Sequence, residues 1–147
     1  MSETHDKEIS AIDAWARLQR ASGAVLARVE ARLKAQGFPP LAWYDVLLEL
    51  NRAEENTLRP VEIERRMLLA QYNVSRLIDR LVAAGYVEKR KSLEDGRGVV
   101  ILLLPKGEAL LKTMWPVYRD AVEAEFSAYL GEGDTETLWR VLGKLLP

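Results

Sequence analysis

One segment of the chain sets the expectations for the rest: Ala70-Gln-Tyr-Asn-Val-Ser-Arg-Leu-Ile-Asp-Arg-Leu-Val-Ala-Ala84. Its apolar residues recur at the spacing of one helix face and are Val74, Leu77, Ile78, Leu81 and Val82. The opposite face is polar and carries Gln71, Tyr72, Asn73, Ser75, Arg76, Asp79 and Arg80. The pattern predicts a helix that buries one side and presents amide, hydroxyl and guanidinium groups on the other. Groups of this kind contact the base edges and phosphates of nucleic acids.

The residues before this helix predict a second, shorter one. Pro60–Met67 begins with proline, which suits the first position of a helix, and we expect Val61, Ile63 and Met67 to be its buried side. Leu58-Arg59 is expected to form a short strand just before it. Two helices joined by a short connection indicate a helix-turn-helix.

The residues after the helix predict a β-hairpin. Gly85 can adopt the positive φ that ends a helix, and Tyr86–Arg90 continues as an extended segment. Gly98–Leu104 is a strongly apolar strand, so the two strands are expected to pair, with the turn at Asp95-Gly96. A helix-turn-helix followed by such a hairpin is a winged helix.

Residues 60 to 111 resemble the DNA-binding core of the MarR family of bacterial transcriptional regulators. The matching segments are Ile63-Glu-Arg-Arg-Met67, Val74-Ser-Arg-Leu-Ile-Asp-Arg-Leu81, Ala84-Gly-Tyr-Val-Glu-Lys-Arg90, Glu94-Asp-Gly-Arg97 and Leu104-Pro-Lys-Gly-Glu-Ala-Leu-Leu111.

Two segments depart from the family pattern. Leu68–Tyr72 stands where the family usually has a glycine turn and a Ser or Thr cap, and Leu104 replaces a capping Thr, so the helix beginning at Pro105 is expected to lack a side-chain acceptor.

The resemblance implies a sequence-specific regulator, most often a repressor, that binds double-stranded DNA at a palindromic operator. Arg97 corresponds to the family's wing arginine, which enters the minor groove. The expected DNA-binding residues are Gln71, Tyr72, Asn73, Ser75, Arg76, Arg80, Lys89, Arg90, Lys91 and Arg97. Among them, the basic residues of the wing strand are expected to contact phosphates only. A winged helix used for protein–protein contact, without operator binding, remains the alternative.

The remaining helices are expected to mediate dimerisation. Helical periodicity extends from about Lys7 to Gln36, and a buried helix follows at Leu41–Asn51. Lys106–Leu130 and a final helix capped by Asp134 complete the chain. We therefore expect a mainly α fold with a small β-hairpin wing, in which 1–36 and 106–147 form a helical dimerisation region and 38–105 the winged helix-turn-helix. The apolar stripes of the terminal helices imply a homodimer, although they could also close a monomeric core.

The resemblance also implies a pocket for a small aromatic effector between the dimerisation helices and the winged helix. The aromatic residues that could line it are Trp15, Trp43, Tyr44, Trp115 and Tyr118. Aromatic residues at helical spacing are more often part of the core, and that reading remains open as well.

Composition and charge exclude several other functions. The chain has no cysteine, and its single histidine, His5, has no partner at metal-ligand spacing, so we expect no metal site, cofactor or thiol chemistry. Neither a nucleophile–base pair nor a phosphate-binding glycine motif is present, which argues against an enzyme. The formal net charge is −1, but residues 59 to 98 carry +3 and the rest −4. Without an apolar run of ~20 residues or a signal-peptide pattern, the protein is expected to be cytoplasmic.

Overall fold

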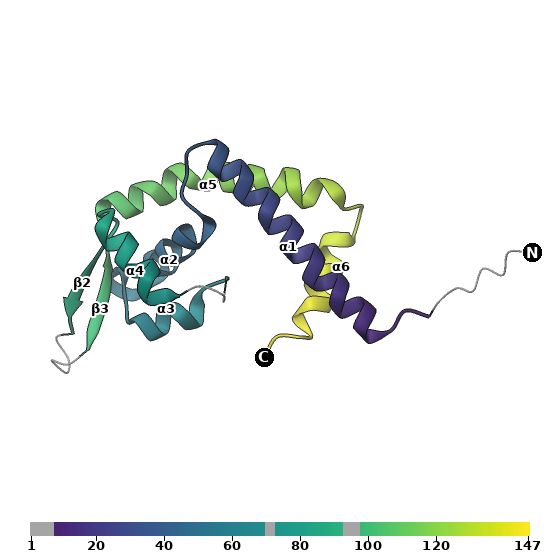
Figure 1. Ribbon diagram of the computed structural model, residues 1–147, viewed down its shortest axis with the longest axis horizontal. Coiled ribbons are helices and arrows are strands. Elements are labelled where there is room, and N and C mark those ends of the chain that lie inside the picture. The colour runs from purple at the N-terminus through teal and green to yellow at the C-terminus, as the bar shows by residue number, and fades with distance from the viewer. Residues whose placement is uncertain (1–7, 70–72, 93–97) are drawn as a thin grey trace, which may run out of the picture.

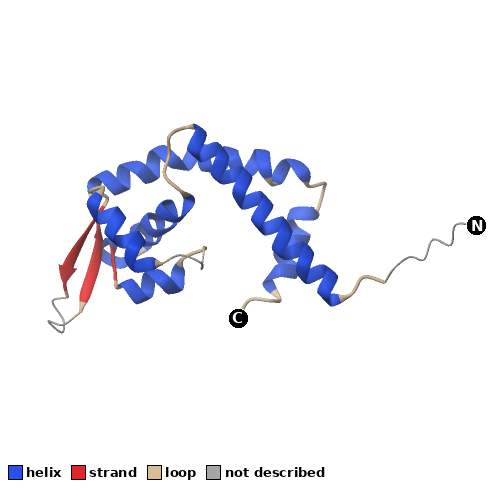
Figure 2. Ribbon diagram, in the orientation of Figure 1, coloured by secondary structure: helices blue, strands red, loops and turns tan. Residues whose placement is uncertain are grey.

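The computed structural model describes residues 8–69, 73–92 and 98–147. Helices dominate these residues, with one small sheet among them (Figures 1 and 2). In chain order the elements are α1 (Ala11–Ala35), α2 (Leu41–Arg52), the 3₁₀ turn η1 (Glu54–Asn56), β1 (Thr57–Leu58), α3 (Pro60–Arg66), α4 (Val74–Ala83), β2 (Val87–Lys91), β3 (Val99–Leu103), α5 (Pro105–Glu125), the 3₁₀ turn η2 (Ser127–Tyr129) and α6 (Asp134–Gly143). The mainly helical winged helix-turn-helix expected from the sequence is confirmed.

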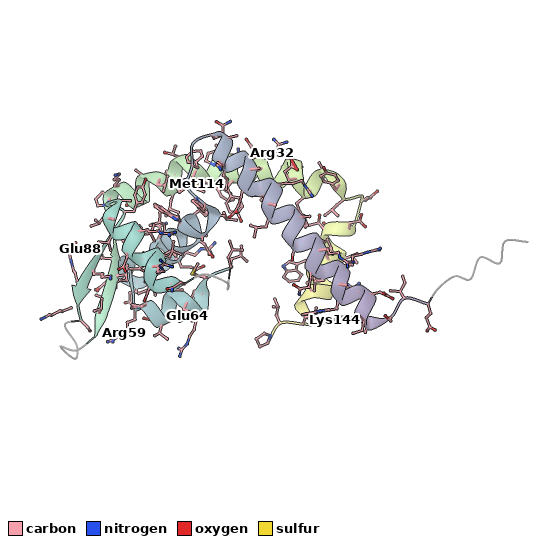
Figure 3. The ribbon with its side chains drawn as sticks, in the orientation of Figure 1. Arg32, Arg59, Glu64, Glu88, Met114 and Lys144 are labelled. Atoms are coloured by element: carbon pink, nitrogen blue, oxygen red, sulfur yellow. The ribbon has the colours of Figure 1, made fainter. Side chains whose placement is uncertain are left out.

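The core of the winged helix-turn-helix lies where α2, α3 and α4 meet the sheet. Leu47, Ile63, Leu81 and Ile101 come from four different elements and are all fully buried in one apolar cluster. Met114 of α5 is also fully buried and belongs to this cluster; Figure 3 shows it on the side of α5 that faces the winged helix-turn-helix. The winged helix-turn-helix and the long helix α5 therefore share one core.

The sheet is antiparallel, with the strand order β1-β3-β2. Its central strand places Ile101 opposite both Leu58 of β1 and Lys89 of β2. The strand expected at Leu58-Arg59 is thus present, although it comprises Thr57–Leu58 and the next residue, Arg59, instead precedes α3 as its N-cap.

The end of α4, the wing and the start of α5 converge at one junction. Gly85 has a φ of 80°, which ends α4 and turns the chain into β2. The Leu104 N–H donates to the Tyr86 carbonyl at 3.0 Å, and α5 begins at Pro105 without a side-chain cap, as the sequence predicted. Lys106 Nζ donates to the Ala84 carbonyl at 2.8 Å and so satisfies an acceptor at the C-terminus of α4.

The terminal helices lie together away from the wing, and α5 extends from the winged helix-turn-helix towards them (Figure 1). Glu125 at the end of α5 accepts hydrogen bonds from Arg32 Nε at 2.8 Å and Arg28 Nε at 3.1 Å. The hydrogen bond from Arg32 is the main reason that the pKa of Glu125 is lowered. This cluster joins the C-terminal third of α1 to α5, whereas no residue of α6 is fully buried.

Four boundary or burial predictions were wrong. Val61 is 49% exposed, because the short α3 directs only Ile63 into the core, and Val82 at the edge of the apolar face of α4 is 36% exposed. Helix α5 ends at Glu125 and gives way to a 3₁₀ turn instead of continuing to Leu130. The N-cap of α6 is Gly133, with a φ of 81°, and Asp134 is the first helical residue.

Candidate nucleic-acid interface

Helix α4 is positioned by its own cap and its apolar side. The side-chain Oδ1 of Asn73 accepts a hydrogen bond from the Arg76 backbone N–H at 3.2 Å, which satisfies one of the free donors at the helix start. Leu77, Ile78 and Leu81 are buried beneath the helix. The sequence predicted Asn73 only as a DNA contact, although asparagine is among the preferred N-cap residues and the capping role could have been anticipated.

The polar face of α4 is open to solvent. Ser75, Arg76, Asp79 and Arg80 are all exposed. Arg76 and Arg80 form no side-chain hydrogen bond or ion pair with any residue that the structure describes. Two adjacent turns of one helix therefore present guanidinium groups that an incoming anion could approach.

The loop end of the wing hairpin is closed by residues that flank β2, β3 and α3. Beyond the ends of β2 and β3, the Ser92 N–H donates to the Gly98 carbonyl at 2.8 Å. Arg59 Nη2 donates to Ser92 Oγ at 3.2 Å, linking the start of α3 to the hairpin. Figure 3 shows Arg59 beside α3, near the loop end of the hairpin. Ser92 is buried although it is polar. Together these contacts fix the direction of the hairpin relative to the helix-turn-helix.

The basic residues of β2 alternate between two faces of the strand. Lys89 lies on the side of Val87 and forms an ion pair with Asp79 of α4, whose Oδ1 is 2.5 Å from Lys89 Nζ. Arg90 lies on the other side and pairs with Glu88 at 3.1 Å. Lys91 makes no such contact within the described residues. Neither ion pair was predicted from the sequence. The pair of Lys89 depends on how β2 lies against α4, whereas Arg90 and Glu88 lie two residues apart on one face of the same strand.

Several predicted DNA contacts lie outside the described residues. They are Gln71 and Tyr72 before α4, and Arg97 in the expected wing loop. The expected turn at Asp95-Gly96 and the single histidine, His5, are also outside. The described part of the candidate interface therefore consists of Asn73, Ser75, Arg76, Arg80, Lys89, Arg90 and Lys91.

Two of the five aromatic residues considered for an effector pocket line a common cavity. Tyr44 and Tyr118 stack edge to face, with ring centroids 5.2 Å apart. They border a cavity of about 230 Å³, and Tyr118 also borders an apolar cavity of about 310 Å³ between α1, α5 and α6. Burial raises the pKa of both tyrosine hydroxyls.

The other three aromatic residues lie elsewhere. The Trp43 ring packs edge to face on Tyr86, at 6.0 Å between centroids. Trp115 packs against Tyr118 at 6.2 Å but remains half-exposed, and Trp15 is largely exposed on α1. None of these tryptophans borders the two cavities that Tyr118 borders.

A buried carboxylate, which was not predicted from the sequence, holds the turn at Leu68 and Leu69 that precedes α4. Asp45 of α2 is only 5% exposed, and its Oδ2 accepts hydrogen bonds from the Leu68 N–H at 2.6 Å and the Leu69 N–H at 3.2 Å. Burial is the main cause of the raised pKa of Asp45, and the neighbouring Glu49 contributes. The sequence indicated this role of Asp45 only by placing a carboxylate within a helix that is apolar on nearly every side.

The described residues show few features of other functional classes. No helix among them combines the length and the apolar character that crossing a bilayer would need. Within the same residues, no group of three or more histidine or carboxylate side chains is arranged as a metal site would require. On α4 and β2 the described residues carry a group of exposed cations, Arg76, Arg80, Lys89, Arg90 and Lys91.

Known proteins share part of the sequence of this chain and its fold. Residues 31–98 match the model of the MarR family. The transcriptional repressor YetL of Bacillus subtilis is 28% identical over 102 residues, which cover 69% of this chain and 60% of YetL. The chain spans 60–64% of the length of the first curated relatives that it matches.

Solved structures of similar fold cover nearly the whole chain. A mutant MarR from E. coli complexed with operator DNA superposes with a TM-score of 0.78 at 25% identity, over 92% of this chain and 96% of that one. BpsR of Bordetella bronchiseptica gives a TM-score of 0.78 at 20% identity, covering 99% of this chain and 97% of BpsR. The matched sequence segment and the shared winged helix-turn-helix agree with each other: residues 31–98 are similar in sequence to the MarR family, and nearly the whole chain shares the fold of MarR structures.

Proposed function

We propose that this chain is a transcriptional repressor that binds a palindromic DNA operator as a homodimer. The observation that carries the proposal is the exposed polar face of α4, where Arg76 and Arg80 have no described partner beside a wing that bears further cations. Arginine recognises guanine edges in the major groove and also contacts phosphates. The names of the relatives support the same role, since YetL is a repressor and the E. coli MarR structure contains operator DNA.

The proposed second copy would cover the terminal helices. Helix α6 has no buried residue, and large apolar side chains are exposed on it, just after it, and at and just before the start of α1. They are Ile9, Ile12, Trp15, Trp139, Val141, Leu145 and Leu146. A two-fold dimer through these helices would present two copies of α4 about one turn of DNA apart, or ~34 Å, and would therefore favour a palindromic site.

A small aromatic ligand is the proposed release signal. The cavity beside Tyr44 and Tyr118 touches Leu68, whose N–H is held by Asp45 in the turn before α4. A ligand that displaced Leu68 would therefore shift α4, the proposed recognition helix. Support also comes from BpsR, whose DNA binding is regulated by 6-hydroxynicotinic acid. Isothermal titration with a panel of aromatic acids tests the proposal, and absence of binding heat throughout the panel would contradict it.

Selection from a random pool of DNA duplexes tests operator binding itself. We expect enrichment of an imperfect palindrome with half-sites about ten base pairs apart, bound by a species of twice the chain mass of 16.6 kDa. Binding that depends on salt but shows no sequence preference would contradict a specific operator. In that case the winged helix would be better explained as a protein-interaction module, the alternative from a different functional class.

Replacing Arg76 with alanine is expected to weaken operator binding by about 1–3 kcal/mol and to relax base preference at one position of each half-site. Arg76 is exposed on α4, so the change removes a DNA contact without opening the core. Titration of the selected duplex and of its single-base variants measures both effects. Arg119→Ala is the matched control, because Arg119 is exposed on α5 and makes its ion pair with the adjacent Asp120. Equal affinities of the two variants would reject Arg76 as a contact.

A further inference from the structure

The centre of the polar face of α4 carries a carboxylate. At 100° per residue, Asp79 lies between Ser75 and Arg76 around the helix, and its side chain is 63% exposed. Any DNA that approaches the two arginines of this face also approaches Asp79. A carboxylate in that position repels phosphates, yet it is an acceptor that matches the N4 amino group of cytosine in the major groove.

Asp79 forms an ion pair with Lys89 of β2, whose Nζ donates to Asp79 Oδ1 at 2.5 Å. Both side chains remain substantially exposed, at 63% for Asp79 and 47% for Lys89. Exposed ion pairs of this kind contribute little to stability. Their consequence is electrostatic: the ammonium group is held against α4 and its charge is compensated, so it is less available to a phosphate.

We propose that Asp79 is a specificity-determining residue that suppresses binding to non-operator DNA. The inference rests on the proposed DNA-binding function. On arbitrary DNA, affinity comes from neutralised phosphates alone, and Asp79 both repels them and retains Lys89. At the operator, a base-edge amino group donates to Asp79 and releases Lys89 to a phosphate. The ion pair can therefore open without a loss of binding free energy only where the DNA supplies a base-edge donor to Asp79.

Asp79→Ala tests this inference by comparing the selected operator with a scrambled duplex over a range of salt concentrations. Release of Lys89 adds one phosphate contact on scrambled DNA, which steepens the logarithmic salt slope by about 0.9 and raises affinity about eightfold at 0.1 M salt. Operator affinity is expected to stay constant or fall. The ratio of operator to scrambled affinity therefore decreases by about eightfold or more.

Two further variants separate this role from a general change of charge. Glu88→Ala is the matched control, since it also removes one exposed carboxylate and frees a cation, Arg90, but on the opposite side of β2. It should change both affinities alike and leave their ratio intact. In a Lys89→Met background, Asp79→Ala should no longer steepen the salt slope on scrambled DNA.

The outcomes distinguish this inference from the proposed function. If the wild-type protein binds its operator but Asp79→Ala leaves the affinity ratio unchanged, Asp79 does not determine specificity and the inference is overturned. An equal fall of the ratio in Glu88→Ala also overturns it, because any lost carboxylate would then suffice. Absence of wild-type binding to both duplexes overturns the proposed function and this inference with it.

Discussion

Replacing Gly107 with alanine is expected to lower the free energy of unfolding by about 1–3 kcal/mol. A Cβ at this position in the first turn of α5 would lie 2.4 Å from the Tyr86 carbonyl oxygen and 2.8 Å from Leu103 Cδ1. The carbonyl belongs to the backbone and is held by the Leu104 N–H, so it cannot move without disturbing the junction. The strain therefore outweighs the gain of about 1 kcal/mol that alanine brings to a helix interior.

Gly23→Ala is the matched control for Gly107→Ala. Gly23 lies within α1, and a Cβ there would meet nothing within 4 Å. The control should raise the free energy of unfolding by about 0.5–1 kcal/mol, because alanine has the better helix propensity. Urea unfolding of both variants measures the contrast. Equal stabilisation by the two substitutions would mean that α5 can move away from the Tyr86 carbonyl without loss of stability.

The parts of the fold that could be predicted from the sequence are those determined by local periodicity. The apolar spacing around Leu77, Ile78 and Leu81 fixed both the existence of α4 and the side that it buries. Gly85 and Pro105 marked a helix end and a helix start, because each has a backbone preference that does not depend on tertiary contacts. The candidate interface followed from the same pattern, since the face opposite a buried stripe must be exposed.

The parts that could not be predicted depend on contacts between elements. The pairing of Asp79 with Lys89 requires the relative placement of α4 and β2, which sequence spacing does not specify. Val61 fits a helical stripe, yet the short α3 buries only Ile63 of its own residues and Met67 at its end, and Val61 faces solvent. Asp45 is the largest omission, because a buried acid is recognisable only when the backbone donors that it satisfies are known.

The second large effect is expected for Asp45→Ala, which should lower the free energy of unfolding by about 1–3 kcal/mol and operator affinity at least tenfold. The substitution leaves the N–H groups of Leu68 and Leu69 without their acceptor in a partly buried turn. Four residues separate Leu69 from the start of α4, so the loosened turn no longer fixes the recognition helix. Urea unfolding and titration of the selected duplex measure the two losses. Unaltered operator affinity in a destabilised variant would show that the turn does not orient α4.

Asp45→Asn separates the charge of the side chain from its hydrogen bonds, and its effect depends on pH. Because burial raises the pKa of Asp45 above its ordinary value of 3.8, the folded protein binds more protons than the unfolded chain between the two pKa values. The stabilisation from this group is therefore complete below the unfolded value and is lost as the pH rises through the folded one. The wild-type protein should lose stability relative to Asp45→Asn over that interval in urea titrations at a series of pH values. Parallel curves for the two proteins would mean that Asp45 titrates as a solvent-exposed acid does, and that its carboxylate is not the buried anchor of the turn.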